Sequence, residues 1–129
     1  MAHDLKHLSP DVLAFLTERH LATLTTHRRD GSLHVCAVGF TFDEMTATAR
    51  VITWATAQKA INAQHGGRAA VAQVDGPRWL SLEGPVRVTS NRDDVATAVE
   101  AYARRYRQPK PRTDRVVIVI DVERVLGRA

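Results

Sequence analysis

The sequence predicts a mostly-β fold, a small barrel of six or seven short strands with a few short helices. Short runs rich in β-branched and apolar residues recur along the chain, and Asp-Gly or Gly-Pro turn signals separate them. Helical patterns are few, and they occur only near the start, in one crossover and near the end. A regular alternation of strands and helices, which would indicate a parallel sheet, is absent, so a small antiparallel barrel fits best.

The first predicted element is a helix over residues 10–20. Ser9 supplies a capping hydroxyl, Pro10 suits the first helical position, and Asp11 places an acid in the first turn. Apolar residues follow at helical spacing, so we expect this helix to bury one side.

The next segment predicts a three-stranded meander. Residues 21–26 are rich in β-branched side chains, and residues 34–42 alternate in the way expected of a half-buried strand. Asp30-Gly31 lies between them and favours a hairpin turn. Residues 50–54 are expected to form the third strand.

Three further strands are predicted in the middle of the chain, over 69–74, 79–82 and 86–89. A tight turn separates the first two, and Gly84-Pro85 is expected to break the chain between the second and third. Proline cannot donate a ladder hydrogen bond, which is why a break is predicted there.

A helix is predicted to begin after Asn91, and a last strand over residues 116–122. An apolar stripe at helical spacing marks the buried side of the helix and consists of Val95, Val99, Tyr102 and Tyr106. Residues 116–122 contain almost no polar interruption, so this strand is expected at the centre of the sheet.

The totals indicate a single domain over residues 1–129. Hydrophobic residues make up 44% and charged residues 25%, as in ordinary globular proteins. No apolar run is long enough to span a membrane, and the N-terminus lacks the apolar stretch of a signal peptide, so the expected location is the cytosol. Cys36 is the single cysteine, which excludes an intrachain disulfide and a cysteine-based zinc site.

The net charge of +4 is concentrated near the C-terminus. Residues 1–99 balance, whereas residues 100–129 carry eight basic and four acidic side chains. A basic surface can attract nucleic acid or an anionic small molecule, although the charge pattern alone is better explained by a solvated helix face. Aromatic residues are only 5%, which leaves few rings for base stacking, so no nucleic-acid partner is expected.

The junction from the strand at 50–54 into a predicted helix at 58–65 is the most informative site in the sequence. Thr56 is a candidate cap, and Lys59 falls in the first helical turn. Free N–H groups and a lysine at that point favour an anion such as phosphate. A merely solvated lysine is the competing interpretation.

The six histidines do not form a recognisable catalytic or metal-binding pattern. His3 and His7 have the spacing of a helical ligand pair but lie in a terminus expected to be frayed. The other histidines come singly from separate elements. We therefore expect no metal site and no catalytic side chain, and any chemistry is expected to come from a cofactor.

The sequence resembles the split β-barrel superfamily of pyridoxamine-phosphate oxidases, and within it the deazaflavin-dependent reductases that use coenzyme F420. Two motifs carry the resemblance, Gln-Lys-Ala-x-Asn at 58–62 and Arg-Trp-Leu-Ser-Leu-Glu-Gly at 78–84. The matching segments in chain order are 21–26, 34–43, 49–53, 58–62, 74–76 and 78–84.

The resemblance implies a six- or seven-stranded split barrel that forms a homodimer with cofactor sites at the interface. By similarity, Lys59 and Gln58 would hold the cofactor phosphate, Asn62 would support the turn, and Trp79 would approach from the partner subunit. The implied cofactor-binding residues are Val35, Val38, Arg50, Ile52, Thr53, Gln58, Lys59, Asn62 and Trp79. Leu33 stands where the family often has a proline, which bears on the backbone beside the ring.

The implied activity is hydride transfer from reduced coenzyme F420 to a planar conjugated small molecule, tetrapyrroles such as biliverdin foremost. The basic segment could hold carboxylates of such a substrate or of the coenzyme. One alternative is an FMN-dependent oxidase or reductase of the same superfamily. Another is a non-enzymatic binding module, either a cofactor carrier or a nucleic-acid-binding barrel. No membrane partner is expected.

Overall fold

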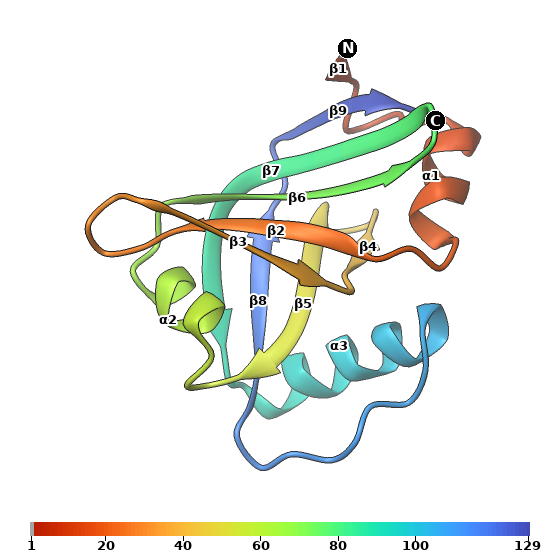
Figure 1. Cartoon of the computed structure of the whole chain (residues 1–129). Coiled ribbons are helices and arrows are strands. Elements are labelled where there is room, and N and C mark those ends of the chain that lie inside the picture. The colour runs from red at the N-terminus through yellow and green to blue at the C-terminus, as the bar shows by residue number, and fades with distance from the viewer. Residues whose placement is uncertain (1) are drawn as a thin grey trace.

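The structure is a computed structural model that describes residues 2–129, and it is mostly antiparallel β-sheet with three helices (Figure 1). The helices are α1 (Pro10–Thr17), α2 (Gln58–Gln64) and α3 (Arg92–Arg105). The strands are β1 (Ala2–His3), β2 (Ala22–His27), β3 (Leu33–Val38), β4 (Thr41–Asp43), β5 (Thr48–Trp54), β6 (Arg68–Asp75), β7 (Arg78–Thr89), β8 (Arg115–Asp121) and β9 (Arg124–Arg128). The mostly-β prediction is confirmed.

The strand order is β3-β2-β6-β7-β8-β5-β4, and β9 pairs with both β7 and β1. The hairpin of β2 and β3 is present as predicted, but the three-stranded meander is wrong. β5 pairs with β8 and β4 and has no pairing with β3. The prediction placed the strand over 34–42 beside the strand at 50–54. In the structure the short β4 takes that place.

The long strand β7 joins the two parts of the sheet. Its first half pairs with β6 and β9, and its second half pairs with β8. The break predicted at Gly84-Pro85 is therefore wrong, because the chain bends there without leaving the strand (Figure 1). A Cβ at Gly84 would lie 2.0 Å from the Asp121 carbonyl oxygen, so only glycine allows this close approach.

The predicted strand over 34–42 is divided into β3 and β4 at Gly39. A Cβ there would lie 3.1 Å from the Tyr106 ring and 3.2 Å from the Tyr102 ring. The helix α3 thus lies directly against the backbone at the corner where the chain turns from one strand into the next.

Large side chains fill the space between the two parts of the sheet and under α1. The fully buried ones include Phe15, Leu24, Phe40, Leu80, Leu82, Ile118 and Ile120. Each contributes about 1.5–3 kcal/mol by leaving water. β8 lies between β7 and β5 with five consecutive buried residues, which confirms its predicted central position.

Two strands were not predicted, β1 and β9. β1 pairs with β9, and His3 Nε2 lies 2.7 Å from the Gly127 carbonyl oxygen, so residues 2–3 are not frayed. Nine strands are present in residues 2–129, more than the six or seven predicted. None of the helices in this range is both long and apolar enough to cross a membrane.

Candidate cofactor-binding site

A pocket of about 220 Å³ lies between the end of β3 and the second half of β5. β4 pairs with β5 only at Thr48–Arg50, so no strand within residues 2–129 pairs with that side of β5 beyond Arg50. The pocket brings together three residues predicted for the cofactor, Val38, Ile52 and Lys59. The other lining residues are Ala37, Gly39, Val51, Tyr102, Pro109 and Arg115.

Lys59 comes to the pocket because β5 leads into α2 through a short turn, closed by a hydrogen bond of 3.1 Å from Ala57 N–H to the Trp54 carbonyl. The N-cap is Ala57 and not the predicted Thr56, and it makes no side-chain cap bond. The Lys59 ammonium lies 5.3 Å from the centre of the Trp54 ring. No carboxylate of residues 2–129 forms an ion pair with it, so its charge faces the pocket without a fixed anion.

Asn62 holds α2 against the sheet. It is 2% exposed, accepts a hydrogen bond of 2.7 Å from Gln58 Nε2, and donates one of 3.1 Å to Thr26 Oγ1. Both ends of the Asn62 amide are thus used inside the protein. This geometry gives Asn62 a supporting position, and Gln58 lies exposed at the start of the helix.

Thr53 carries an orphaned polar atom and follows Ile52, which lines the pocket. The residue is 1% exposed, and its hydroxyl has no hydrogen-bond partner. Leaving a buried hydroxyl unpaired costs about 1–3 kcal/mol. With the free ammonium of Lys59 nearby in the chain, the donor set fits an anionic, hydrogen-bonding ligand such as a phosphorylated cofactor.

Besides Thr53, Gln58 and Asn62, three further predicted residues lie outside this pocket. Val35 and Trp79 project from the outer face of the sheet and are 58% and 38% exposed. Arg50 lies on the side of β5 that faces α3, where its guanidinium is 3.3 Å from the Asp43 carboxylate. The assignment of these three residues to the cofactor stays a prediction.

The pocket residues that sequence reasoning missed include Tyr102, Pro109 and Arg115. Tyr102 belongs to the predicted apolar stripe of α3, and that stripe was the signal that could have found it. Pro109 and Arg115 also line a neighbouring pocket of about 270 Å³. The two pockets therefore adjoin, and we refer to them together as the groove.

The second pocket of this groove combines an apolar floor from α3 with basic residues. Val95 and Val99 form the floor, and Lys110 and Arg112 stand beside it. Arg112 lies over the Trp54 ring at 4.8 Å and pairs with Asp114 at 2.9 Å. Arg115 donates to the Lys110 carbonyl, which ties the loop after α3 to β8.

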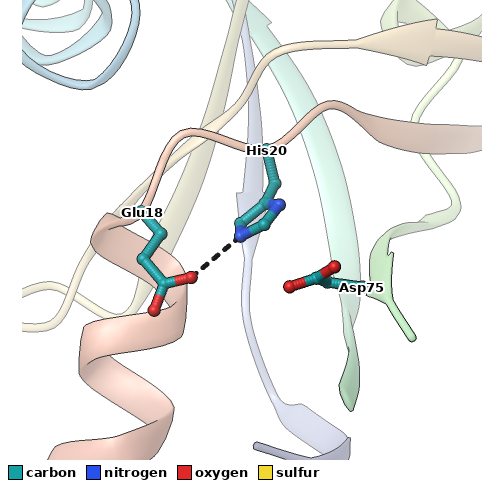
Figure 2. Close-up of side chains that lie close together, drawn as sticks. All are labelled: Glu18, His20 and Asp75. Atoms are coloured by element: carbon teal, nitrogen blue, oxygen red, sulfur yellow. Dashed lines mark hydrogen bonds and ion pairs between the residues drawn. The ribbon is translucent and has the colours of Figure 1, made fainter. Parts of the chain in front are cut away.

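A second cluster of titratable groups lies outside the groove, where Glu18, His20 and Asp75 point toward one another (Figure 2). Their ligand atoms lie within 4.8 Å of each other. Arg78 pairs with both carboxylates, at 3.0 Å from Glu18, and lies over the Phe15 ring. The guanidinium already balances the acidic groups, so this cluster is an ion-pair network that joins α1 to β6 and β7.

The fold and the lysine-bearing pocket define a family. The chain belongs to the pyridoxamine 5'-phosphate oxidase family, whose sequence profile matches residues 8–129. It is 57% identical over 129 residues to the F420H(2)-dependent biliverdin reductase of Mycobacterium tuberculosis (strain CDC 1551 / Oshkosh). The match covers 100% of this chain and 94% of that protein. The resemblance found in the sequence is confirmed.

Two solved structures share the fold. A conserved hypothetical protein of Mycobacterium tuberculosis has a TM-score of 0.79 and 21% identity, covering 95% of this chain and 85% of that chain. An F420 reductase has a TM-score of 0.71 and 24% identity, covering 88% of this chain and 94% of that chain. At these identities the likeness extends to the fold alone.

Proposed function

We propose that this protein is a reductase that binds reduced coenzyme F420 and transfers hydride to a conjugated bond of a planar substrate such as biliverdin. The observation that carries the proposal is the 57% identity, over the whole chain, to an F420H(2)-dependent biliverdin reductase. The groove supports it, because a free lysine and an apolar wall lie together there, and the unpaired Thr53 hydroxyl is buried in the strand that leads to that lysine.

When bound, the deazaflavin supplies the hydride. The chain's own residues hold the ligands in contact and exclude water, so no side chain has to act as a nucleophile. Lys59 binds the cofactor phosphate, the backbone of 37–39 lies beside the ring, and Ile52 and Thr53 line the connecting chain. The groove around Lys110 and Arg115 takes carboxylates of the substrate or of the coenzyme.

The finer part of the proposal is a split barrel that works as a homodimer. Leu33, Val35, Val74 and Trp79 are 60%, 58%, 69% and 38% exposed. The register places them on one face of the sheet, because Val35 pairs with Thr25, which pairs with Ala70, and Val74 pairs with Trp79. Exposed apolar side chains gathered on one face of a sheet mark an interaction surface. A second copy seated there brings Trp79 toward the ring-side strand of its partner.

Titration with two cofactors tests the proposal. Coenzyme F420 and FMN are added separately to the protein, and binding is followed by their fluorescence. The reduced form of the tighter ligand is then mixed with biliverdin, and loss of biliverdin is followed by absorbance. Binding of F420 with biliverdin turnover is expected. Tighter binding of FMN with an oxidase or reductase activity would establish the alternative, and F420 binding without turnover of any tetrapyrrole would indicate a carrier.

A further inference from the structure

Arg105 is a partly buried cation that the proposed chemistry does not use. It ends α3, yet its guanidinium points into the protein and meets no carboxylate of residues 2–129 within ion-pair distance. Nε donates to the Glu18 carbonyl at 2.8 Å, Nη1 to the Phe40 carbonyl at 2.6 Å, and Nη2 to Gln73 Oε1 at 2.7 Å. Burial lowers the pKa of Arg105, although Tyr106 and Glu18 oppose this electrostatically, and the oxygens that accept its hydrogen bonds are all neutral.

Tyr106 adds a second set of contacts to the same place. Its hydroxyl donates to the His20 carbonyl at 2.7 Å and accepts from the Phe40 N–H at 3.1 Å. Its ring lies against Gly39, as the 3.1 Å distance from a Cβ built there shows. We call Arg105 and Tyr106 the clasp. They hold the Gly39–Phe40 corner through hydrogen bonds to the Phe40 backbone and through contact between the Tyr106 ring and Gly39.

The clasp also reaches the rest of the sheet. Gln73, which accepts from Arg105, is 1% exposed and donates from Nε2 to the Phe15 carbonyl at 2.9 Å. The guanidinium thus joins α3 to α1, to the β3–β4 corner and to β6. A buried charge persists only when its hydrogen bonds are satisfied, so the acceptors fix the position of the group closely.

The corner that the clasp holds is the end of the pocket wall. Ala37, Val38 and Gly39 line the pocket that contains Lys59, and Tyr102, one turn before Tyr106, lines it from α3. The two tyrosine rings lie 4.9 Å apart. Neither Arg105 nor Tyr106 lines that pocket, so both act on it through the backbone of residues 37–40.

We propose that Arg105 and Tyr106 are positioning residues, which set the place of the β3 backbone beside the cofactor ring and thereby the affinity for the cofactor. This inference rests on the proposed function for the identity of the ligand. It goes beyond it because neither residue belongs to the expected binding set.

Two clasp variants and a matched control test the inference by F420 fluorescence titration. Tyr106→Phe removes only the hydroxyl and keeps the ring on Gly39, and Arg105→Lys keeps the charge but loses the planar fork. Arg104→Gln is the control, because Arg104 is exposed in the same turn. Since small misplacements cost large factors, both clasp variants are expected to raise the dissociation constant about tenfold or more. The control should stay within about twofold.

The titration separates positioning from simple instability. Loss of folded protein lowers the number of binding sites, whereas displacement of the wall raises the dissociation constant at an unchanged number of sites. A Tyr106→Phe variant with the affinity of the original chain would overturn the inference. Full affinity in Arg105→Lys would do the same, because it would show that charge alone matters.

Hydrogen exchange without any ligand gives a readout that does not depend on the cofactor. The amides of residues 37–40 are expected to exchange faster in Tyr106→Phe and to stay unchanged in Arg104→Gln. If the original chain binds neither F420 nor FMN, the proposed function fails. The positioning role of the clasp is then tested by hydrogen exchange alone. Faster exchange at residues 37–40 in Tyr106→Phe supports that role, and unchanged exchange overturns it.

Discussion

At the scale of single residues, Lys59 is the predicted cofactor-binding residue that the sequence supports best. In the structure it lines the pocket between β3 and β5. Lys59→Ala is expected to weaken cofactor binding by about 1.5–3 kcal/mol, the range for a charge-assisted hydrogen bond. The fold should lose little stability, because Lys59 pairs with no carboxylate of residues 2–129. Fluorescence titration measures the change, and Lys6→Ala, in an exposed turn near the N-terminus, is the control. Unchanged affinity in the Lys59 variant would remove this assignment.

Glu18 gives a prediction about pH. Arg78 and then His20 hold its pKa at about 2, below the ordinary value of 4.5. Between these two values the unfolded chain binds a proton that the folded chain does not. The contribution of Glu18 is therefore fully present above pH 4.5 and is lost as the pH falls to about 2.

Thermal unfolding at several pH values tests this contribution. Glu18→Gln should show a shallower fall in melting temperature between pH 5 and pH 2 than the original chain does, as expected from a depressed carboxylate pKa. The difference should be modest and should shrink with added salt, because the carboxylate is 44% exposed. Glu100→Gln, at an exposed position of α3, is the control. Parallel curves for Glu18→Gln and the original chain would contradict the prediction.

At the scale of elements, local patterns predicted most helices and strands, and the errors arose where a distant contact decides. The local sequence Gly84-Pro85 predicts a break, but β7 continues through it, and the Gly84 backbone lies close to the Asp121 carbonyl. Gly39 reads as part of a strand, but the tyrosines of α3 make it a corner. Pro109 reaches the pocket through the path of a loop, and Arg115 reaches it from the start of β8 where that loop ends, and periodicity does not encode this path.

The loop between α3 and β8 carries the basic groove, and we expect it to bind carboxylates. Changing Arg107, Lys110 and Arg112 together to Gln should weaken coenzyme F420 or biliverdin more than FMN, whose one phosphate is expected at Lys59. A few contacts around an apolar ring should give a shallow salt dependence, whereas binding along a nucleic-acid backbone would give a steep one.

Affinities at two salt concentrations, alongside an oligonucleotide, test the basic groove. The control changes Lys6, Arg29 and Arg92 to Gln, which removes the same charge from exposed positions that line neither pocket of the groove. Equal weakening by both triple variants would show that only net charge matters. Tight oligonucleotide binding at physiological salt, without cofactor binding, would overturn the enzyme assignment.

At the scale of the whole molecule, the groove and the exposed apolar face are separate features that a second copy would join. Val38 and Lys59 line the groove, whereas Val35 lies three residues before Val38 on the outer face of the same strand. The resemblance predicted both sets as one site. In a single chain Val35 and Trp79 do not line the groove, although Ala37, which faces the same side of β3 as Val35, does. A dimer built on the outer face would let one site draw on both.

We therefore expect a homodimer of twice the 14.3 kDa chain mass at micromolar concentration, measured by sedimentation. Val74→Glu places a charge on the apolar face, and burying that charge at an interface is costly, so the variant should sediment as a monomer and bind F420 more weakly. Met45→Glu, on a turn and 90% exposed, is the matched control and should remain dimeric. The two measurements must change together, because the dimer is proposed to complete the site with Trp79 of the partner. A monomer that binds F420 as tightly as the original chain would refute the shared site, and a Val74→Glu variant that stays dimeric would show that the chains associate through another surface.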